Sequence, residues 1–461
     1  MASDWVHTKL GDIFKVKHGF AFKGEYFSDA PTNSFLLTPG NFSTSGGFQD
    51  IKPKYYDGPI PDDYILKPSQ VVVTMTDLSK QSDTLGYAVS IPNDGKVWLH
   101  NQRTGLLEFK KEYPSDPLFI SYLLRSHEYR SWIIGSATGT TVKHTSPTRI
   151  HDFECKIPPL SEQKAIAHIL GSLDNKIELN RQMNETLEAM AQALFKSWFV
   201  DFDPVIDNAL AAGNAIPDAF AKRAEQRKGI EKKDHSDTQN LFPDEFEFTD
   251  EMGWIPKGWE VKESGDLFDV RDGTHDSPKK SDEGKYLITS RHITSGVIDY
   301  PNAYLISQDD FDEVNKRSLV ESYDILITMI GTVGVSMLVL QDEIDFAIKN
   351  VGLFKTSNNK SYAVFFYLYL NSNYMTQFLD SRLAGTTQKY LTLKVLRALP
   401  VVTPDNKTLS HFVNNMSPIF KKIHSNHEQI GILAKLRDTL LPKLMSGEIR
   451  IPDAEALVEY V

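Results

Sequence analysis

The chain has 461 residues, of which 41% are hydrophobic and 11% aromatic, which is enough for folded cores and excludes a wholly disordered protein. Its one cysteine, Cys155, excludes an internal disulfide and a four-cysteine zinc site, and is typical of the reducing cytoplasm. The formal net charge of −11 disfavours nucleic-acid binding over the whole surface. Residues 1–15 carry charges throughout, so we predict no secretory signal and a cytoplasmic location.

The acidity is concentrated in residues 200–253, which hold 6 basic and 13 acidic residues. Residues 1–160 hold 17 of each, and residues 254–404 hold 16 basic and 19 acidic residues. An acidic connecting segment can stay clear of a duplex. A DNA surface on either flanking part would therefore have to come from local clusters of lysine and arginine.

Residues 1–157 are rich in short β patterns and predict a first globular domain. We expect strands at 70–74, 86–91 and 105–109, with glycine, proline, asparagine and aspartate between them, and a helix over 118–127.

Residues 158–200 predict one long helix, starting near Ser161, which is a suitable N-cap. Its apolar stripe consists of Leu173, Ile177, Leu187, Leu194 and Trp198. A helix over 161–199 would span roughly 60 Å. Residues 201–253 predict an acidic, mostly polar linker with one short helix over 218–228.

Residues 254–404 predict a second globular domain. The apolar run at 325–340 is interrupted by glycines, so it predicts two buried strands around a turn and not a membrane span. The C-terminal segment 405–461 contains a second long helix, over about 409–445.

The chain contains the same pattern twice. Trp5, Gly11, Asp12, Phe14, Val16 and Gly19 recur 254 positions later. Gly139, Thr140, Thr141 and Lys143 recur 246 positions later, and the same offset relates the two long helices. Two long copies imply an approximate internal two-fold axis, a symmetry that duplex DNA also has. The helices would then be antiparallel partners in a two-stranded coiled coil.

Asn180 and Asn426 occupy equivalent positions on the two helical stripes. One interpretation is that both are buried and fix the register of the coiled coil. The other is that the stripe drifts and both face solvent.

Four separated segments resemble the specificity subunits of type I restriction-modification systems. They are the Gly-Trp-Ile-Pro-Lys-Gly-Trp motif at 253–259, the Pro-Pro-Leu-Ser-Glu-Gln motif at 158–163, the Asp-Ile-Leu-Ile-Thr-Met-Ile-Gly-Thr-Val-Gly motif at 324–334, and the Leu-Arg-Asp-Thr-Leu-Leu-Pro-Lys-Leu-Met-Ser-Gly-Glu-Ile motif at 436–449. The resemblance covers essentially the whole chain. It implies an α+β fold of two β-rich, pseudo-two-fold-related target-recognition domains joined by two long antiparallel helices in a coiled coil.

The resemblance also implies a function without chemistry of its own. Each recognition domain would read one half of a bipartite double-stranded DNA site, and the helices would fix the spacer. The helices would dock two adenine methyltransferase subunits, which bring S-adenosylmethionine and flip the base. A motor-nuclease subunit would then join the complex. The chain itself would need no cofactor and no metal.

Two departures from the family pattern bear on the site. The first copy has Thr74-Met75-Thr76-Asp77-Leu78 where the second has the Gly-Thr-Val-Gly turn, and the second helix lacks the Leu-Ser-Glu-Gln entry. The first departure obscures which loop reads DNA in the first domain, and the second obscures one partner contact.

Base reading needs hydrogen-bond donors on loops or helix ends, because these can enter the major groove. In the first copy the candidates are Ser79, Lys80, Gln81, Asn101, Gln102, Arg103, Thr140, Thr141, Lys143 and His144. In the second they are Arg271, His275, Lys279, Lys280, Arg291, His292, Lys349, Asn350, Thr386, Thr387, Gln388 and Lys389. Arginine can grip guanine, while asparagine and glutamine can grip adenine. Any single candidate can equally be a solvated side chain, and the repeated Gly-Thr-Thr can be a helix cap.

Apolar residues at the helix ends are candidate anchors for partner subunits. They are Phe195, Trp198, Phe199, Leu440 and Leu444. The alternative is that they only close the coiled coil.

Two rival functions remain open on the sequence alone. Asp244, Glu260 and Lys262 mimic the acidic and lysine residues of a nuclease metal site, which would make the chain a standalone metal-dependent endonuclease. A scaffold that only dimerises proteins is the other rival. Neither a nucleotide-binding Gly-x-x-x-x-Gly-Lys loop nor an Asp/Asn-Pro-Pro-aromatic motif occurs in the sequence.

Overall fold

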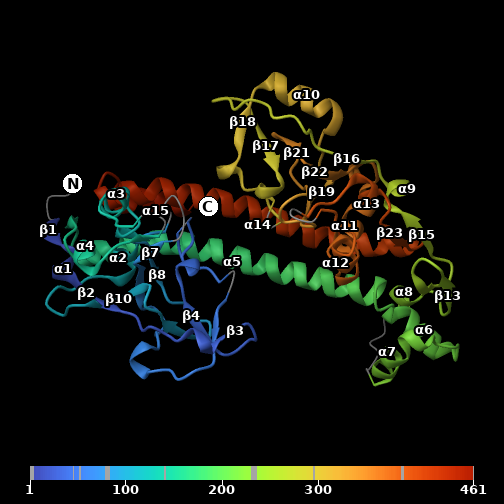
Figure 1. Ribbon diagram of the computed structural model, residues 1–461, viewed down its shortest axis with the longest axis horizontal. Helices are drawn as coiled ribbons and strands as arrows, with labels where there is room; N and C mark the ends of the chain where they lie inside the picture. Colours follow the sequence, from blue (N-terminus) through green and yellow to red (C-terminus); the bar gives the residue numbers. More distant parts are fainter. Residues whose placement is uncertain are drawn as a thin grey trace. The chain divides into compact units, whose positions relative to one another are not determined.

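A computed structural model describes residues 5–44, 46–50, 53–77, 84–139, 142–229, 236–293, 296–385 and 389–459. The chain divides into two compact units. Unit 1 comprises residues 1–180 and 428–461, and unit 2 comprises residues 181–427. Each unit is an α+β structure that contains one stretch of each long helix (Figure 1).

The long helices are α5 (Leu160–Phe199) and α14 (Asn406–Ser446). The predicted helices are confirmed, but Ser161 is not an N-cap, because α5 begins one residue earlier at Leu160. Inside each unit the two helices run antiparallel. In unit 1 Asp174 bonds to Arg437, and Asn180 bonds to Gln429. The residue numbers therefore increase along α5 while those of the contacted residues decrease along α14.

Both stripe asparagines are buried, as the first interpretation predicts. In unit 1 Asn180 Nδ2 donates to Gln429 Oε1 at 2.8 Å. In unit 2 Asn426 is fully buried, and its Nδ2 donates to Asn184 Oδ1 at 2.7 Å. A buried amide that leaves its partner on the facing helix loses a hydrogen bond without gaining water, so these pairs favour the observed register.

Unit 1 is built around a four-stranded antiparallel sheet whose spatial order is β2, β10, β6, β8. The strands are β2 (Phe14–His18), β10 (Thr104–Phe109), β6 (Val71–Thr74) and β8 (Ala88–Ser90), which confirms the three predicted strands. A second sheet contains β3 (Phe27–Ser28), β5 (Tyr55–Tyr56), β4 (Ser34–Leu37) and β9 (Val97–His100), with β4 and β9 parallel. Two further pairs are β1 (Val6–Lys9) with β12 (Glu154–Ile157), and β7 (Thr76–Asp77) with β11 (Lys143–His144).

The helices of unit 1 besides the long pair are short. They are α1 (Leu10–Ile13), α2 (Pro117–Leu123), α3 (His127–Gly135), α4 (Pro147–His151) and α15 (Ile451–Glu459). The helix expected over 118–127 ends at Leu123, and a new one starts at His127, because Ser126 caps α3 by accepting a hydrogen bond from the Tyr129 amide.

Unit 2 repeats this plan. Its four-stranded sheet has the order β16 (Val270–Asp272), β22 (Val351–Phe354), β19 (Ile325–Thr328) and β20 (Ser336–Leu338), so the predicted strand-turn-strand over 325–340 is confirmed. A three-stranded sheet has the order β18 (Tyr304–Ile306), β17 (Lys285–Thr289) and β21 (Phe346–Lys349), with β17 and β21 parallel. The strands β15 (Glu260–Glu263) and β23 (Pro400–Thr403) pair as β1 and β12 do.

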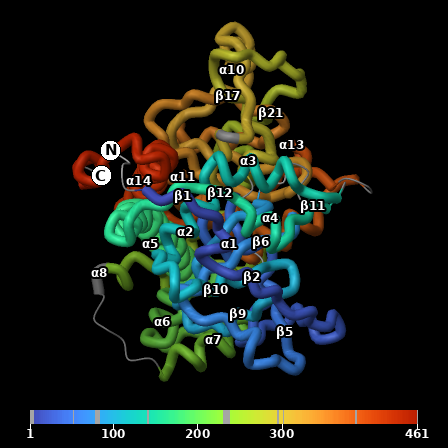
Figure 2. Tube along the Cα trace, turned by 90° about the vertical axis from the view of Figure 1, so that its left-hand side faces the viewer, coloured from blue at the N-terminus to red at the C-terminus, as the bar shows by residue number. Residues whose placement is uncertain are grey.

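The helices of unit 2 outside the linker are α9 (Ser264–Leu267), α10 (Gln308–Ser318), α11 (Lys360–Leu370), α12 (Asn373–Asp380) and α13 (Leu393–Arg397). Figure 2 shows α10 beside β17 and β21. The buried helix α11 packs with the end of α5, where Phe195 and Phe365 place their ring centroids 5.4 Å apart.

The segment 201–253 is more ordered than the sequence predicts. The expected helix α7 (Asp218–Lys228) is present, but α6 (Asp203–Ala212), α8 (Ser236–Gln239) and the hairpin of β13 (Phe246–Thr249) and β14 (Gly253–Pro256) accompany it. Asp203 is buried and accepts two hydrogen bonds of 2.7 Å from Arg223. The basic residues of α7 pair with buried acidic residues of α6, as Arg227 also does with Asp207, so these two helices pack together although the segment as a whole is acidic. The predicted domain boundaries remain predictions.

The described helices include none that is both long and apolar enough to span a bilayer.

Candidate nucleic-acid interface

In unit 1 several separated segments meet at one end of the four-stranded sheet, and we call this region rim 1. It consists of residues 19–20, 75–77, 101–103 and 143–144. The Phe20 carbonyl accepts a hydrogen bond from the Gln102 amide at 2.9 Å, and the Phe20 amide donates one to the His100 carbonyl at 2.8 Å. The turn 101–103 between β9 and β10 is thereby fixed against the end of β2.

Met75 joins two of the predicted groups in rim 1. Its amide donates to the Arg103 carbonyl at 3.0 Å, and its carbonyl accepts from the Thr145 amide at 3.0 Å. The Asn-Gln-Arg turn and the Lys143-His144 strand therefore lie on either side of one residue, although 40 positions separate them in the sequence. Gln102, Arg103 and His144 are exposed there.

Gly139, the first residue of the repeated Gly-Thr-Thr, lies in a short hairpin beside Met75. Thr138 and His144 close this hairpin through two backbone hydrogen bonds of 3.0 and 2.9 Å. Gly139 has φ +94°, and a Cβ on it would lie 2.0 Å from the Val142 carbonyl oxygen. The glycine is therefore required by the loop, and this argues against a helix cap as the only reason for the repeat.

Eight predicted DNA contacts lie outside the described residues. They are Ser79, Lys80, Gln81, Thr140, Thr141, Thr386, Thr387 and Gln388. Asp77 and Thr84, which flank the stretch containing Ser79, Lys80 and Gln81, hold each other in place. The buried Asp77 carboxylate accepts hydrogen bonds from the amide and the hydroxyl of Thr84 at 2.7 and 2.9 Å. Asp77 belongs to rim 1, and Thr84 is bonded to it directly.

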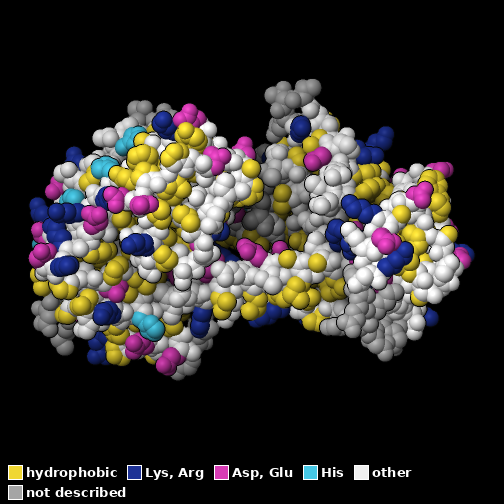
Figure 3. All heavy atoms as spheres, turned by 90° about the horizontal axis from the view of Figure 1, so that it is seen from below, with side chains coloured by type: hydrophobic (Ala, Val, Ile, Leu, Met, Phe, Trp, Pro, Cys, Tyr) yellow, Lys and Arg dark blue, Asp and Glu magenta, His cyan; other side chains and the backbone are white. Residues whose placement is uncertain are grey.

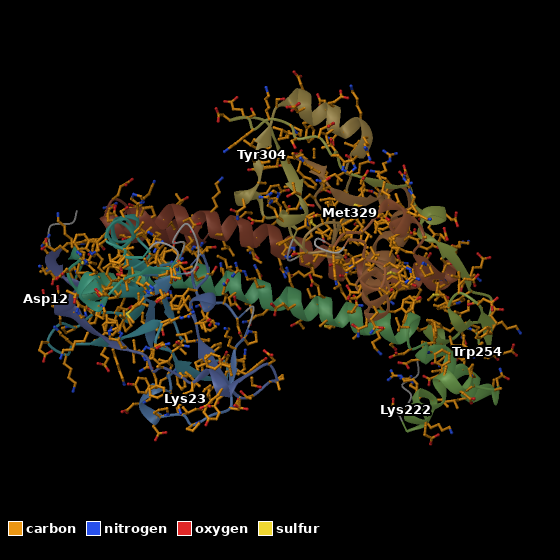
Figure 4. The ribbon with its side chains drawn as sticks, viewed as in Figure 1. Asp12, Lys23, Lys222, Trp254, Tyr304 and Met329 are labelled. Atoms are coloured by element: carbon orange, nitrogen blue, oxygen red, sulfur yellow. The ribbon has the colours of Figure 1, made fainter. Side chains whose placement is uncertain are left out.

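Rim 2 is the corresponding region of unit 2, and it consists of residues 273–275, 329–330, 349–350 and 389–390. Met329, labelled in Figure 4, follows β19. Its carbonyl accepts a hydrogen bond from the Leu391 amide at 2.9 Å, as the Met75 carbonyl does from the Thr145 amide. Ala384 and Tyr390 close a hairpin with bonds of 3.0 and 2.9 Å, and Gly385 has φ +88°. The bond between Met75 and Thr145 and the two bonds that close the hairpin of rim 1 thus recur in rim 2 at the offsets of the sequence repeat.

The repeated glycines Gly19 and Gly273 have a common physical reason. A Cβ on Gly19 would lie 2.1 Å from the Asn101 carbonyl oxygen, and one on Gly273 would lie 2.4 Å from the Ile348 carbonyl oxygen. Each glycine lets the end of the first sheet strand approach the neighbouring turn closely. That approach places residues 101–103 and 349–350 in their rims.

The structure brings together most of the described candidates of unit 2. Lys349 bonds to Ser277, His275 bonds to Asn350, and Lys389 is exposed next to Tyr390. Arg291 is exposed in the 3₁₀ turn Ser290–His292, which the Ser290 hydroxyl ties to the Asn350 carbonyl at 3.1 Å.

A crevice of about 670 Å³ adjoins rim 2. It is lined by the loop Thr274–Lys279 and by Asp310, Glu313, Val314 and Arg317 of α10. Lys279 and Lys280 are exposed at its loop side, so they can reach a phosphate backbone.

Two other candidates of unit 2 are also held by neighbouring groups. Arg271 is held by Asp269 at 2.8 Å and by the Arg317 carbonyl at 3.1 Å. His292 is buried, its Nδ1 accepts the Thr289 amide at 3.1 Å, and burial lowers its pKa. The expectation that the His292 side chain reaches a base is therefore wrong, since its ring caps its own turn.

Sequence reasoning missed Tyr390, whose side chain is 41% exposed on rim 2. It is the counterpart of His144 at the offset of 246 positions, so the repeat could have identified it. Aromatic faces can stack on bases or pack against thymine methyl groups.

The prediction that five apolar side chains are exposed partner anchors is wrong. The residues are Phe195, Trp198, Phe199, Leu440 and Leu444, and all of them are buried in the cores of their own units. The globular part of each unit packs over these helix ends. The apolar side chains that do reach the surface of the long helices are Leu179 and Ile432 in unit 1, and Met183 and Met190 in unit 2.

The geometry gives little support to a nuclease metal site. Lys262 pairs with Glu260 at 2.7 Å on strand β15, where both side chains are exposed. Among the described residues, no group of three His, Cys, Asp or Glu is placed to hold a metal ion.

Charged side chains of both signs are interspersed over the surface shown in Figure 3. This agrees with the nearly balanced charge of residues 1–160 and 254–404. The basic and amide groups of the two rims are therefore local features of an otherwise mixed surface.

Comparison with known proteins identifies similar chains. Residues 2–189 and 256–433 match a family described as the type I restriction modification DNA specificity domain. The chain is 30% identical over 364 residues to the HindI type I restriction enzyme specificity subunit of Haemophilus influenzae, with 72% of this chain and 77% of that protein covered. It is 25% identical over 359 residues to the MjaIX specificity subunit of Methanocaldococcus jannaschii, covering 75% and 72%.

A similar fold has been solved. The crystal structure of a type I restriction-modification system S subunit from M. genitalium matches with a TM-score of 0.54 and 16% identity, over 96% of each chain.

Proposed function

The chain belongs to the family of type I restriction-modification specificity subunits, and on this premise we propose that each of its two units reads one half of a bipartite double-stranded DNA site. The observation that carries the proposal is the recurrence of one rim in both units. The backbone bonds at Met75 and Met329, and the hairpins closed at His144 and Tyr390, follow one plan.

The rims offer the groups that base and phosphate recognition needs. Rim 1 presents Asn101, Gln102, Arg103, Lys143 and His144, and rim 2 with its borders presents His275, Lys279, Lys280, Arg291, Lys349, Asn350 and Lys389. Arginine and amide side chains can read base edges, and lysines can hold phosphates. Because the side chains differ between rims built on the same backbone plan, the two units would read different half-sites.

In this proposal the chain works in the cytoplasm and catalyses no reaction itself. The helices α5 and α14 set the spacer between the half-sites and dock two adenine methyltransferase subunits, which bind S-adenosylmethionine, and through them the motor-nuclease subunit. Leu179 and Ile432 in unit 1, and Met183 and Met190 in unit 2, are the exposed apolar groups suited to these contacts.

Mapping of adenine methylation tests the function directly. The chain is co-expressed with its cognate methyltransferase subunit in a host free of adenine methylation, and modified adenines are mapped over the genome. We expect one motif made of two fixed half-sites separated by a fixed gap. An assembled complex that adds no methylation would refute the proposal, and metal-dependent cleavage by the chain alone would favour the endonuclease.

Substitution of Met190 tests the docking surface of unit 2. Met190 is 57% exposed, so Met190→Glu should leave the fold intact while it places a charge in an apolar contact. We expect at least about tenfold weaker binding of one of the two methyltransferase subunits, corresponding to about 1.4 kcal/mol. Native mass spectrometry of the purified complex would show one bound subunit where the wild type has two.

The exposed Ala189 provides a matched control for that substitution. It lies about 100° further round the same helix, so Ala189→Glu adds the same charge outside the proposed contact. If both variants keep two methyltransferase subunits at full affinity, Met190 does not belong to the docking surface.

A further inference from the structure

Asn350 occupies an unusual position between two sheets of unit 2. It is the residue between β21 and β22, and it has φ +53°, in the left-handed region that asparagine tolerates better than most residues. Its amide donates to the Thr274 carbonyl at 3.2 Å, and its carbonyl accepts from the Ser290 hydroxyl at 3.1 Å. With the backbone held on both sides, its side chain has little freedom to leave rim 2.

The Asn350 side chain is held in turn by His275. His275 Nδ1 lies 2.8 Å from Asn350 Oδ1, and its Nε2 lies 3.1 Å from a carboxylate oxygen of Asp272. The Asp272 carboxylate is buried and also pairs with Arg317, so it stays in place. The Asn350 Oδ1 atom can only accept a hydrogen bond, so Nδ1–H of His275 is the donor of this pair.

This arrangement leaves one half of the Asn350 amide for a ligand. Its oxygen is occupied by His275, and its NH₂ group remains as a donor. The bidentate grip of asparagine on adenine needs the oxygen as well as the nitrogen. A side chain held in this way can donate to acceptors such as guanine O6 or N7, adenine N7 or thymine O4, but it cannot receive the adenine or cytosine amino group.

A cavity of about 350 Å³ lies at this point of rim 2. Its lining includes Asp272, His275, Asn350, Met329 and Tyr390. The donor of Asn350 thus borders a partly apolar recess next to an exposed aromatic ring. This is the combination of one directed polar group and apolar surface that suits a base edge.

From this geometry we propose that Asn350 is a specificity-determining residue that reads a hydrogen-bond acceptor on a base, and that His275 is the positioning residue that selects the donor half of its amide. The inference rests on the proposed reading of one half-site by unit 2. The inference applies to unit 2 alone. In unit 1 the Gln102 amide bonds to the Phe20 carbonyl as the Asn350 amide bonds to Thr274, so Gln102 is the counterpart of Asn350. The position that corresponds to His275 is Ala21, which has no side chain to hold an amide.

Methylation mapping with Asn350→Asp tests which half of the amide is used. The substitution keeps the shape but replaces the donor by an acceptor. We expect the motif to change at one base pair of one half-site, toward a base with an amino group such as cytosine, or methylation at the original motif to fall about tenfold or more. The other half-site and the spacer should not change.

Asn358 supplies a matched control, since it is exposed after β22, on the side away from the rim. Asn358→Asp should give the wild-type motif. An Asn350→Asp variant that methylates the wild-type motif at full efficiency would overturn the inference while leaving the proposed function intact. A wild-type complex that assembles but produces no motif would overturn both.

Substitutions of His275 separate positioning from folding and remain informative if Asn350→Asp abolishes methylation. His275→Ala frees the Asn350 amide to turn, so we expect the same base pair to become degenerate while overall methylation persists. His275→Gln keeps a donor toward the Asn350 oxygen and should restore the wild-type base. An unchanged motif in His275→Ala would overturn the role of His275, and equal degeneracy in both variants would do so as well.

Discussion

Replacement of Asp174 by alanine is expected to destabilise unit 1 by about 3–5 kcal/mol. Asp174 on α5 accepts hydrogen bonds from Tyr122 at 2.7 Å, from Arg125 at 3.3 Å and from Arg437 on α14 at 2.8 Å. The side chains of Arg125 and Arg437 are only 7% and 4% exposed. Without the carboxylate, two guanidinium groups lose a counter-ion at buried positions.

Hydrogen exchange of the full chain would locate the effect. We expect faster exchange in residues 160–180 and 428–446, the helical segments of unit 1 that the network joins, together with a lower melting temperature. Asp453→Ala is the matched control, because Asp453 pairs with Arg450 at 3.2 Å on an exposed surface. Such a pair contributes at most about 1 kcal/mol. Equal effects of the two substitutions would contradict the importance of the buried network.

The same network predicts a dependence on pH. Burial opposes ionisation of Asp174, but Arg125 and Arg437 outweigh burial and hold the pKa of this carboxyl below its ordinary value. A depressed carboxyl pKa stabilises the folded state above the ordinary value and loses that contribution as pH falls through the folded pKa. The difference in stability between the wild type and Asp174→Asn should therefore shrink in acid, and a difference that is constant down to denaturing pH would contradict this assignment.

Duplication made much of the fold and part of the candidate interface predictable from sequence. The recurrence of Gly19 after 254 positions and of Gly139 after 246 positions marks backbone positions that both units need, and the structure shows close approaches or left-handed backbone at these sites. The hydrophobic stripe likewise located both long helices.

The errors have a common physical cause. A helical stripe indicates that a side chain such as Phe195 is buried, but not whether its own domain or another subunit covers it. The charges of Asp203 and Arg223 are 20 positions apart, and only the folded helices α6 and α7 bring them within 2.7 Å. Contacts between distant positions without a repeat to mark them are invisible to local patterns.

Replacement of either repeated glycine by alanine is expected to impair the recognition of one half-site only. The added Cβ of Gly19→Ala meets the Asn101 carbonyl oxygen at 2.1 Å, and that of Gly273→Ala meets the Ile348 carbonyl oxygen at 2.4 Å. Both obstacles are backbone atoms, so the turn 101–103 or 349–350 has to move. Overpacking of this kind costs about 1–3 kcal/mol. We expect binding to the full site to fall about tenfold or more, since misplaced base contacts cost about as much as a mismatch.

Binding of the assembled methyltransferase complex to three duplexes would measure this effect. One duplex carries both half-sites, and each of the others has one half-site altered. The wild type should lose affinity when either half is altered. Gly19→Ala should be insensitive to alteration of one half but remain sensitive to the other, and Gly273→Ala should show the converse. Gly24→Ala and Gly229→Ala are the controls, because a Cβ meets nothing within 4 Å at Gly24 and only an atom at 3.9 Å at Gly229.

This pattern tests the independence of the two rims more stringently than the loss of binding does. Each glycine contacts only its own unit, so a local displacement should leave the base preferences of the other rim unchanged. If one alanine removed sensitivity to both half-sites, the two rims would not act as separate readers. If neither alanine changed discrimination, the close approach at the glycines would not set the positions of residues 101–103 and 349–350, and the reading surface would have to be sought on other loops of each unit.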